Sequence, residues 1–394
     1  MPDGIIAGSQ LSRDSLDQDA IEALAWSSMP DLEPVETRRP LARGGRGATT
    51  NPAVRYDRHT AEPFEDGWTS LGAELADLPP LPTTLIRDTS KTAISWNSSP
   101  DIGFDRAINP YRGCEHGCVY CYARPSHAYL GYSPGLEFET QIVFKPDVAR
   151  LLERELSKPS YVAQPMTLGS NTDPYQPVDR TLRLTRAVLE MLDRFSHPVS
   201  IVTKSAGVLQ DLDILQRMAA RGLVRVWLSV TTLDAGLARR MEPRAAAPSR
   251  RLQTIAALTQ AGVPSGVLAA PMIPGLNDME LEKILTAARQ HGAMHAGYVL
   301  LRLPLELRDV FTAWLQEHVP DRARRVLALI RETRAGELND SRFHHRFAGG
   351  GPYADLLAQR FARMTRQLGF LGREALDTTQ FSRPLAARDQ LSLL

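Results

Sequence analysis

From residue 104 onward, short apolar runs alternate with stretches in which apolar residues recur three and four positions apart. The short runs predict β-strands, and the second pattern predicts amphipathic helices. The expected strands lie within 104–110, 161–173, 199–205, 224–234, 263–275 and 295–304. The expected helices lie within 145–159, 178–195, 209–222, 248–262 and 278–292, and a further helical stretch begins near residue 305.

This alternation of strands and helices requires parallel strands joined by right-handed crossovers. We therefore predict an α/β fold in which a partial (βα)6 barrel spans residues 101–305. Residues 306–394 are predicted to form a helical C-terminal region. A doubly wound open sheet is the alternative that the same alternation allows.

The first hundred residues have a different pattern. Segments such as "EPVETRRPLARGGRGATTNPAVRYDRH" and "LADLPPLPTTLIRD" are rich in Pro, Gly and Arg and lack sustained periodicity. Residues 1–100 are therefore predicted to be an N-terminal extension that is irregular in part. The glycine and arginine stretch from Arg38 to Arg46 fits a solvated flexible arm better than a contact with a polyanion.

Composition and charge limit the class of protein. The chain has 394 residues, of which 43% are hydrophobic, enough for a full-size core. No run of about 18 apolar residues occurs, so we expect no membrane span. The N-terminus is too acidic and too interrupted for a signal or transit peptide, which predicts a cytoplasmic protein. The net charge of +1 gives no whole-molecule attraction to nucleic acid.

One local stretch is basic. Residues 321–347 hold seven arginines and four acidic residues. Such a stretch can follow a phosphate backbone, but arginines on amphipathic helices more often cover a solvated face. Nucleic acid therefore stays a candidate partner.

Polar residues follow the expected strands. In parallel α/β barrels the loops after the carboxyl ends of the strands converge over one mouth, where functional groups gather. A cysteine-containing loop follows the first expected strand. The later strands are followed by Ser170, Asn171 and Asp173, by Thr203 and Lys204, by Ser229 and Thr231, and by Arg302.

All three cysteines of the chain lie within eight residues, as Cys114, Cys118 and Cys121. An odd number of thiols cannot pair fully, and thiols in a reducing compartment are free to ligate a metal. Zinc would need a fourth ligand, for which His116 and His127 are candidates. An iron–sulfur cubane on three cysteines would instead leave one iron for a non-protein ligand. Both sites remain open, and the spacing favours the cluster.

At this point the motifs resemble a known family. "CEHGCVYC" (residues 114–121) resembles the C-x3-C-x-aromatic-C signature of the radical S-adenosylmethionine (radical SAM) superfamily, with Tyr120 at the aromatic position. With "IVTKS", "LSVTTLD" and "MIPGLND", the pattern is similar to the branch that contains spore photoproduct lyase and the DNA repair photolyase-like proteins. The resemblance covers about residues 105–305.

The resemblance implies a cofactor pair and a set of site residues. The three cysteines would bind a [4Fe–4S] cluster whose fourth iron takes S-adenosylmethionine, and an electron donor such as flavodoxin or ferredoxin would reduce it. Lys204 would face the methionyl carboxylate. The remaining implied contacts are Gly169, Ser170 and Asn171 at the methionyl ammonium, Ser229 and Thr231 at the ribose, and Tyr120 and the turn containing Met272 at the adenine.

The chain also departs from that branch. Spore photoproduct lyase uses a further cysteine as a hydrogen-atom donor, whereas this chain has no cysteine outside the motif. The cysteine count also excludes auxiliary clusters with cysteine ligands. Hydrogen would then come from 5′-deoxyadenosine, an external reductant, or a tyrosine such as Tyr122, Tyr129 or Tyr175. The resemblance implies a radical enzyme with an unidentified substrate, for which a nucleotide or nucleic acid is the candidate. The alternative is a non-enzymatic iron–sulfur or zinc protein that senses redox state or binds a partner.

Overall fold

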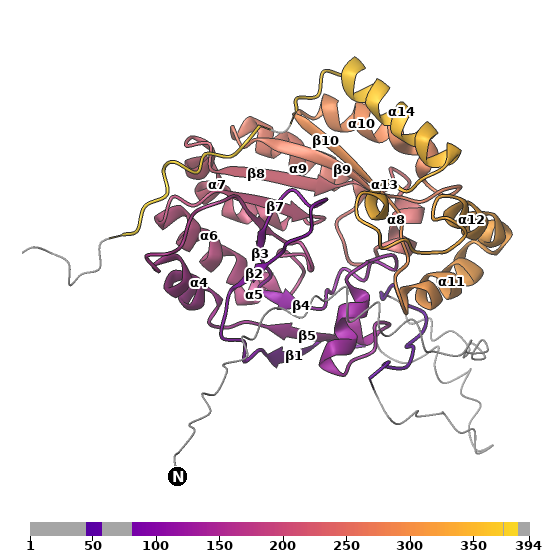
Figure 1. Cartoon of the computed structure of the whole chain (residues 1–394), viewed down its shortest axis with the longest axis horizontal. Coiled ribbons are helices and arrows are strands. Elements are labelled where there is room, and N and C mark those ends of the chain that lie inside the picture. The colour runs from indigo at the N-terminus through magenta and orange to yellow at the C-terminus, as the bar shows by residue number, and fades with distance from the viewer. Residues whose placement is uncertain (1–44, 57–80, 373, 385–394) are drawn as a thin grey trace, which may run out of the picture. The chain divides into compact units, whose positions relative to one another are not determined.

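Six parallel strands form the central sheet of the computed structural model, which describes residues 45–56, 81–372 and 374–384. Across the sheet the strands follow the order in which they occur along the chain, with no reversal (Figure 1). A seventh strand, β2 (Ile94–Trp96), pairs antiparallel with β3 at one edge. The parallel strands are β3 (Arg106–Ile108), β6 (Met166–Leu168), β7 (Val199–Thr203), β8 (Val224–Ser229), β9 (Ser265–Met272) and β10 (His295–Leu300).

This topology confirms the predicted α/β fold with six strand–helix units. The sheet is open, because β2 and β10 lie at opposite edges. A doubly wound sheet requires a reversal of strand order, so that alternative is wrong. The domain boundaries at residues 100 and 305 stay a prediction.

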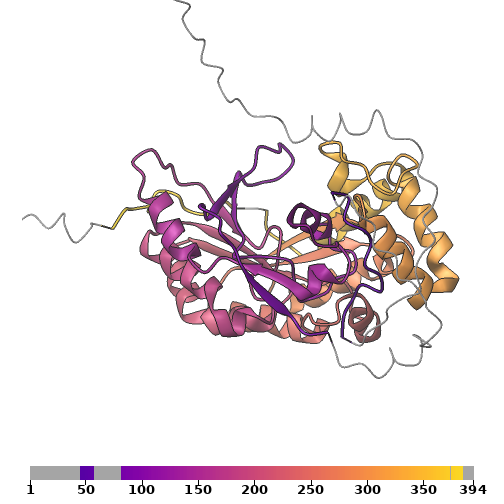
Figure 2. The same ribbon diagram turned by 90° about the horizontal axis from the view of Figure 1, so that it is seen from below.

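Helices lie along the outside of the curved sheet (Figures 1 and 2). Right-handed crossovers that always advance in one direction bring the helices to the same face. The apolar stripe of each helix meets the strands, and Leu152, Val188 and Ile284 are fully buried there. The covering helices are α4 (Val148–Leu156), α6 (Leu184–Arg194), α7 (Leu212–Ala219), α9 (Pro248–Gln260) and α10 (Leu281–Gln290). Helix α8 (Ala235–Met241) instead packs in a second apolar cluster with Val119 and Trp314.

A small second sheet was not expected from the sequence. It has the order β1 (Thr84–Arg87), β5 (Gln141–Phe144) and β4 (Tyr111–Arg112). Both β1 and β2 lie in the predicted N-terminal extension, which is therefore irregular only in part. Short helical turns complete the connections: η1 (Arg124–Leu130), α3 (Glu137–Thr140), α5 (Asp179–Leu182), η2 (Ala206–Asp211) and η3 (Asp278–Glu280).

The C-terminal region is helical, as predicted. One buried arginine fixes it to the central sheet: Arg334 donates hydrogen bonds to the carbonyl oxygens of Leu300 (2.7 Å) and His345 (2.7 Å). These bonds hold α13 at the end of β10. The region contains α11 (Leu307–His318), α12 (Pro320–Glu332), α13 (His345–Ala348) and α14 (Pro352–Gln367).

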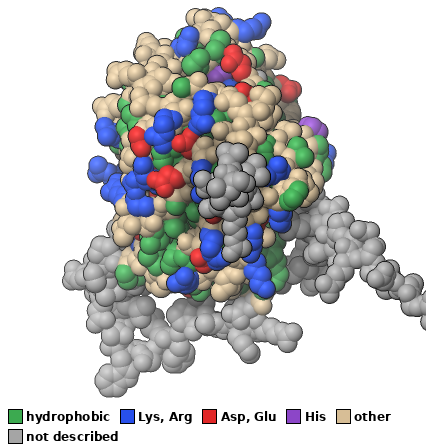
Figure 3. All heavy atoms as spheres, turned by 90° about the vertical axis from the view of Figure 1, so that its left-hand side faces the viewer, with side chains coloured by type: hydrophobic (Ala, Val, Ile, Leu, Met, Phe, Trp, Pro, Cys, Tyr) green, Lys and Arg blue, Asp and Glu red, His purple; other side chains and the backbone are tan. Residues whose placement is uncertain are grey.

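Charged side chains are mixed on the face that carries the outer helices, where basic and acidic groups lie side by side (Figure 3). Ion pairs there include Arg186 with Glu190 and Arg217 with Asp193. Within the described residues, no helix has the length and apolar character needed to span a membrane.

The basic stretch 321–347 is not one surface. Arg334 is buried, and Arg342 and Arg346 form ion pairs with Asp340 and Asp101. The other four arginines of the stretch are exposed along α12. They are Arg322, Arg324, Arg325 and Arg331.

Candidate functional site

The cysteine loop begins directly after β4 and follows a fixed backbone path. Gly113 and Gly117 adopt positive φ angles of 78° and 67°, which glycine tolerates without strain. The Val119 amide donates to the Met241 carbonyl (3.0 Å), and this bond joins the loop to the end of α8.

The three thiols are free, and two of them are buried. Burial raises the pKa of Cys114 and of Cys118. A metal that binds these two thiols must therefore displace their protons.

A cavity of about 220 Å³ opens over the carboxyl ends of the strands, and all three cysteines line it. One side is polar and comes from the loops after β6, β7 and β8. The other side is mostly apolar and comes from the ends of β9 and β10. Polar-side residues include Asn171, Thr172, Asp173, Thr203, Lys204 and Ser229, and the apolar side includes Leu268, Ala270, Pro271, Val299, Leu301 and Phe347.

Asp173 organises the polar side of the cavity. Its carboxylate accepts hydrogen bonds from the Thr203 hydroxyl (2.7 Å) and the Lys204 amide (2.7 Å), and it lies 3.3 Å from His116 Nδ1. Burial by itself would raise the pKa of Asp173, but His116 and these hydrogen bonds hold it at about 2. A charged Asp173 therefore ties the cysteine loop to the end of β7.

Glycine is required at position 169. Its φ angle is +92°, and a Cβ atom there would lie 2.5 Å from the Val202 carbonyl oxygen. The loop after β6 can therefore pass close to β7. Beyond it, the Asn171 amide donates to Asn109 (3.0 Å) and the Thr172 hydroxyl donates to Gly113 (2.7 Å).

Tyr120 forms a wall of the cavity through a buried polar network. Its hydroxyl donates to Glu242 and lies 3.0 Å from Thr231 Oγ1. Arg251 pairs with the same carboxylate, and both charged side chains are almost fully buried. The Lys204 ammonium lies 5.7 Å from the centre of the Tyr120 ring. The network therefore fixes the Tyr120 ring beside Lys204, which also lines this cavity.

The structure brings together most of the predicted site residues, but not all. Ser170 lies outside the lining and accepts a hydrogen bond from Asn109 (3.1 Å). Thr231 lies behind Tyr120, and Met272 is fully buried in the core. The predicted residues that do line the cavity are Cys114, Cys118, Cys121, Tyr120, Gly169, Asn171, Lys204 and Ser229.

The two candidate zinc ligands have other partners. His116 lines the cavity but faces Asp173, and His127 packs against Tyr132 and Phe138. In the described part of the chain, no group of three or more His, Cys, Asp or Glu side chains is arranged to hold one metal ion. A cubane distributes its thiolate ligands over different irons. Three thiolates at one cavity are a donor set that a cubane can take.

Some residues of the site were not predicted from the sequence. Glu242 and Arg251 form the network behind Tyr120, and Phe347 reaches the cavity from α13. No local pattern marks Glu242, Arg251 or Phe347, because each arrives from a separate segment. Arg302 was expected after the last strand, and its guanidinium lies 5.6 Å from the Tyr122 ring and 5.7 Å from the Phe347 ring.

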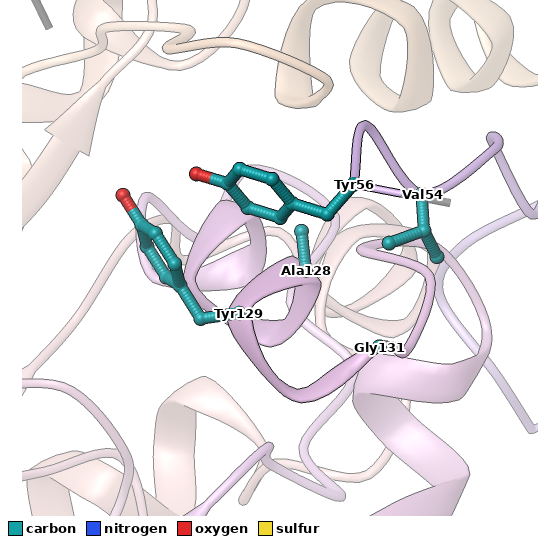
Figure 4. Close-up of a pocket in the computed structure, with 5 residues that line it drawn as sticks. All are labelled: Val54, Tyr56, Ala128, Tyr129 and Gly131. Carbon is teal, nitrogen blue, oxygen red and sulfur yellow. The ribbon is translucent and has the colours of Figure 1, made fainter. Parts of the chain in front are cut away.

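A second cavity, of about 550 Å³, lies beside η1 (Figure 4). It is lined by Val54, Tyr56, Ala128, Tyr129 and Gly131. The rings of Tyr56 and Tyr129 are 5.4 Å apart, and both are exposed. No cysteine lines this cavity, so Tyr129 is placed away from the three thiols.

Comparisons with known proteins agree with this geometry. The model of the Radical SAM superfamily matches residues 108–288. Protein Rv2578c of Mycobacterium tuberculosis is 36% identical over 230 residues, which cover 58% of this chain and 68% of the relative. Protein MJ0683 of Methanocaldococcus jannaschii is 27% identical over 196 residues, or 50% and 70% of the two chains. Both relatives are described as uncharacterised.

Solved structures of spore photoproduct lyase share the fold. A complex of that enzyme with dinucleoside spore photoproduct has a TM-score of 0.52 and 16% identity, with 72% of this chain and 79% of the enzyme covered. A variant of that enzyme with bound S-adenosylmethionine (AdoMet) and the same dinucleoside also has a TM-score of 0.52. The identity is 14%, and the match covers 74% of this chain and 85% of the variant.

We predict that Arg251→Ala destabilises the protein by about 3–5 kcal/mol, because it leaves the buried Glu242 carboxylate without its partner. Chemical denaturation measures the change. Arg150→Ala is the matched control, since its ion pair with Asp147 is exposed, and it should cost less than about 1 kcal/mol. Equal losses for the two variants would contradict the assigned role of the buried pair.

Proposed function

The chain belongs to the radical SAM superfamily, and on this premise we propose that its three cysteines hold a [4Fe–4S] cluster at the cavity. When bound, the cluster supplies the electron that cleaves S-adenosylmethionine into methionine and a 5′-deoxyadenosyl radical, which attacks the substrate. The observation that carries the proposal is the common cavity of Cys114, Cys118 and Cys121 with Lys204 and Ser229. An external donor such as flavodoxin or ferredoxin would provide the electron.

The polar side of the cavity suits S-adenosylmethionine. Lys204 offers a compact positive charge for the methionyl carboxylate. Asn171 and the backbone beside Gly169 offer oxygen acceptors for the ammonium group, and Ser229 offers a hydroxyl to the ribose. The fixed Tyr120 ring offers a flat face to the adenine.

The apolar side is proposed to receive the substrate. Val299, Leu301 and Phe347 exclude water there, and Arg302 contributes a cation. Aromatic rings beside an arginine suit a planar, anionic group such as a nucleotide or a nucleic acid strand. The exposed arginines of α12 are a second feature that suits nucleic acid.

Anaerobic reconstitution of the wild type should give about four irons per chain and a cubane absorption spectrum. Cys118→Ala should lose most of this iron, because one of the three thiolate ligands is missing. Tyr129→Ala is the control, since Tyr129 lies at the other cavity. Stoichiometric zinc with no iron in the reconstituted wild type would contradict the proposal.

Replacing Lys204 tests the cofactor pocket. Lys204→Ala should weaken S-adenosylmethionine binding by roughly 1.5–3 kcal/mol, the range for a hydrogen bond to a charged group. Calorimetry on the reconstituted protein measures the affinity, and the iron content should be unchanged. Lys283→Ala, which removes an exposed lysine on α10, should bind like the wild type. Wild-type affinity in Lys204→Ala would mean that the carboxylate is held elsewhere.

The number of cysteines leads to a prediction about whether the protein repairs spore photoproduct. All three thiols line one cavity and are assigned to the cluster, so no fourth cysteine can return a hydrogen atom. We expect reduced enzyme with S-adenosylmethionine to form 5′-deoxyadenosine without restoring thymine in DNA that contains spore photoproduct. Chromatography follows both products, and a reaction without S-adenosylmethionine is the blank. Repair over many turnovers would contradict this expectation.

A further inference from the structure

A short N-terminal segment lies against the backbone of the cysteine loop. Residues 46–52, "RGATTNP", are here called the strap. Gly47, Ala48 and Thr49 are buried, although the surrounding sequence resembles a solvated arm. The expectation of a flexible arm is therefore wrong at Arg46, which donates to the carbonyl oxygens of Glu139 (2.7 Å) and Leu81 (2.6 Å). Residues 38–44 lie outside the described residues.

The contact between strap and loop requires glycine on both sides. A Cβ atom at Gly47 would lie 1.7 Å from the Gly117 carbonyl oxygen, where no side chain fits. A Cβ atom at Gly117 would lie 2.7 Å from Glu139 Oε2, and the φ angle there is positive. Gly117 stands between Cys114 and Cys118, so the strap touches the part of the loop that carries two of the thiols.

A buried carboxylate joins the strap to the loop. Glu139 accepts hydrogen bonds from the amides of Gly47 (2.9 Å) and Ala48 (2.8 Å), and its side chain is fully buried. The same carboxylate accepts a hydrogen bond from Arg124 (2.5 Å). Arg124 in turn donates to the Cys118 carbonyl (2.8 Å). A continuous chain of bonds therefore runs from the strap to the backbone of a cysteine.

A second connection reaches the loop through Arg46. Its guanidinium donates to the Thr83 hydroxyl (3.1 Å), and that hydroxyl donates to Glu115 (2.6 Å), the residue after Cys114. The far end of the strap is also held, because the Ser133 hydroxyl donates to the Pro52 carbonyl (2.5 Å). Hydrogen bonds therefore hold the strap at both ends, at Arg46 and at Pro52, and its contact with the cysteine loop lies between these ends.

We propose that the strap is a positioning element that holds the cysteine loop in its ligand-presenting conformation and shields the loop from solvent. Gly47 and Glu139 are positioning residues, since they act on the cysteines through Gly117 and Arg124. The expected effect of the strap on the cluster rests on the proposed function. The expected effect of the strap on the thiols does not, because the same contacts exist without a metal.

Gly47→Ala tests the proposal in the full chain. The added methyl cannot fit against Gly117, so the strap should separate from the loop. In the protein without metal, alkylation of Cys114 and Cys118 by iodoacetamide should become at least about tenfold faster. In reconstituted protein, iron should be bound roughly 10–100-fold more weakly in competition with a chelator, the range of affinity loss for residues that orient metal ligands. Ala53→Val is the control, because Ala53 is an exposed neighbour of the strap and should behave like the wild type.

The outcomes separate this proposal from the proposed function. Wild-type alkylation rates in Gly47→Ala would overturn the proposed role of the strap, whether or not the protein binds iron. Failure of the wild type to bind iron would contradict the proposed function while leaving the alkylation test decisive. If Gly47→Ala does not fold, Arg46→Met provides the same test, since it removes all three described hydrogen bonds of the Arg46 guanidinium without adding bulk. Unchanged alkylation rates of the thiols in a folded Arg46→Met protein would then overturn the proposed role of the strap.

Discussion

The buried ion pair between Arg124 and Glu139 fixes the backbone that carries the three cysteines. Both side chains are fully buried, and charges removed from water are costly unless every polar atom is used. Here Arg124 also bonds the carbonyls of Cys118, Pro134 and Gly135, and Glu139 also bonds two amides of the strap. Eight residues could not hold three thiols in a fixed geometry by themselves, because so short a loop has no core of its own.

The parallel sheet explains why the other functional groups meet this loop. Lys204 and Ser229 come from neighbouring strands whose carboxyl ends reach the same edge, so adjacent loops deliver adjacent side chains. Asp173 joins this edge to the cysteine loop through His116, while the Lys204 amide binds the same carboxylate. A change in the register of one strand would therefore affect both the cofactor pocket and the thiols.

The sequence predicts the features that repeat or stand close together along the chain. Six strands follow from periodicity, and the cysteines, Lys204 and Ser229 follow from their places after those strands. Met272 was expected beside the adenine, but it is fully buried in the core, whereas Ala270 lines the cavity. The pairing of β9 with β10 shifts register between Ala269 and Met272, so regular alternation does not predict which side chains face the cavity there. The strap could not be found locally, because Gly47 and Glu139 are 92 residues apart. Strands β1 and β2 lie in the Pro-, Gly- and Arg-rich extension, where no sustained periodicity marks them.

The substrate is the part of the proposal that fold alone does not determine. Spore photoproduct lyase shares the architecture at 14–16% identity, and one architecture serves many reactions. Substrate preference is therefore expected to depend on the side chains that line the cavity. Phe347 is one of these, since α13 carries it to the apolar side of the cavity and Arg334 holds α13 against β10. The side proposed for the cofactor is built by the sheet, whereas the side proposed for the substrate is completed by the C-terminal region, where side chains can change without disturbing the cysteine loop.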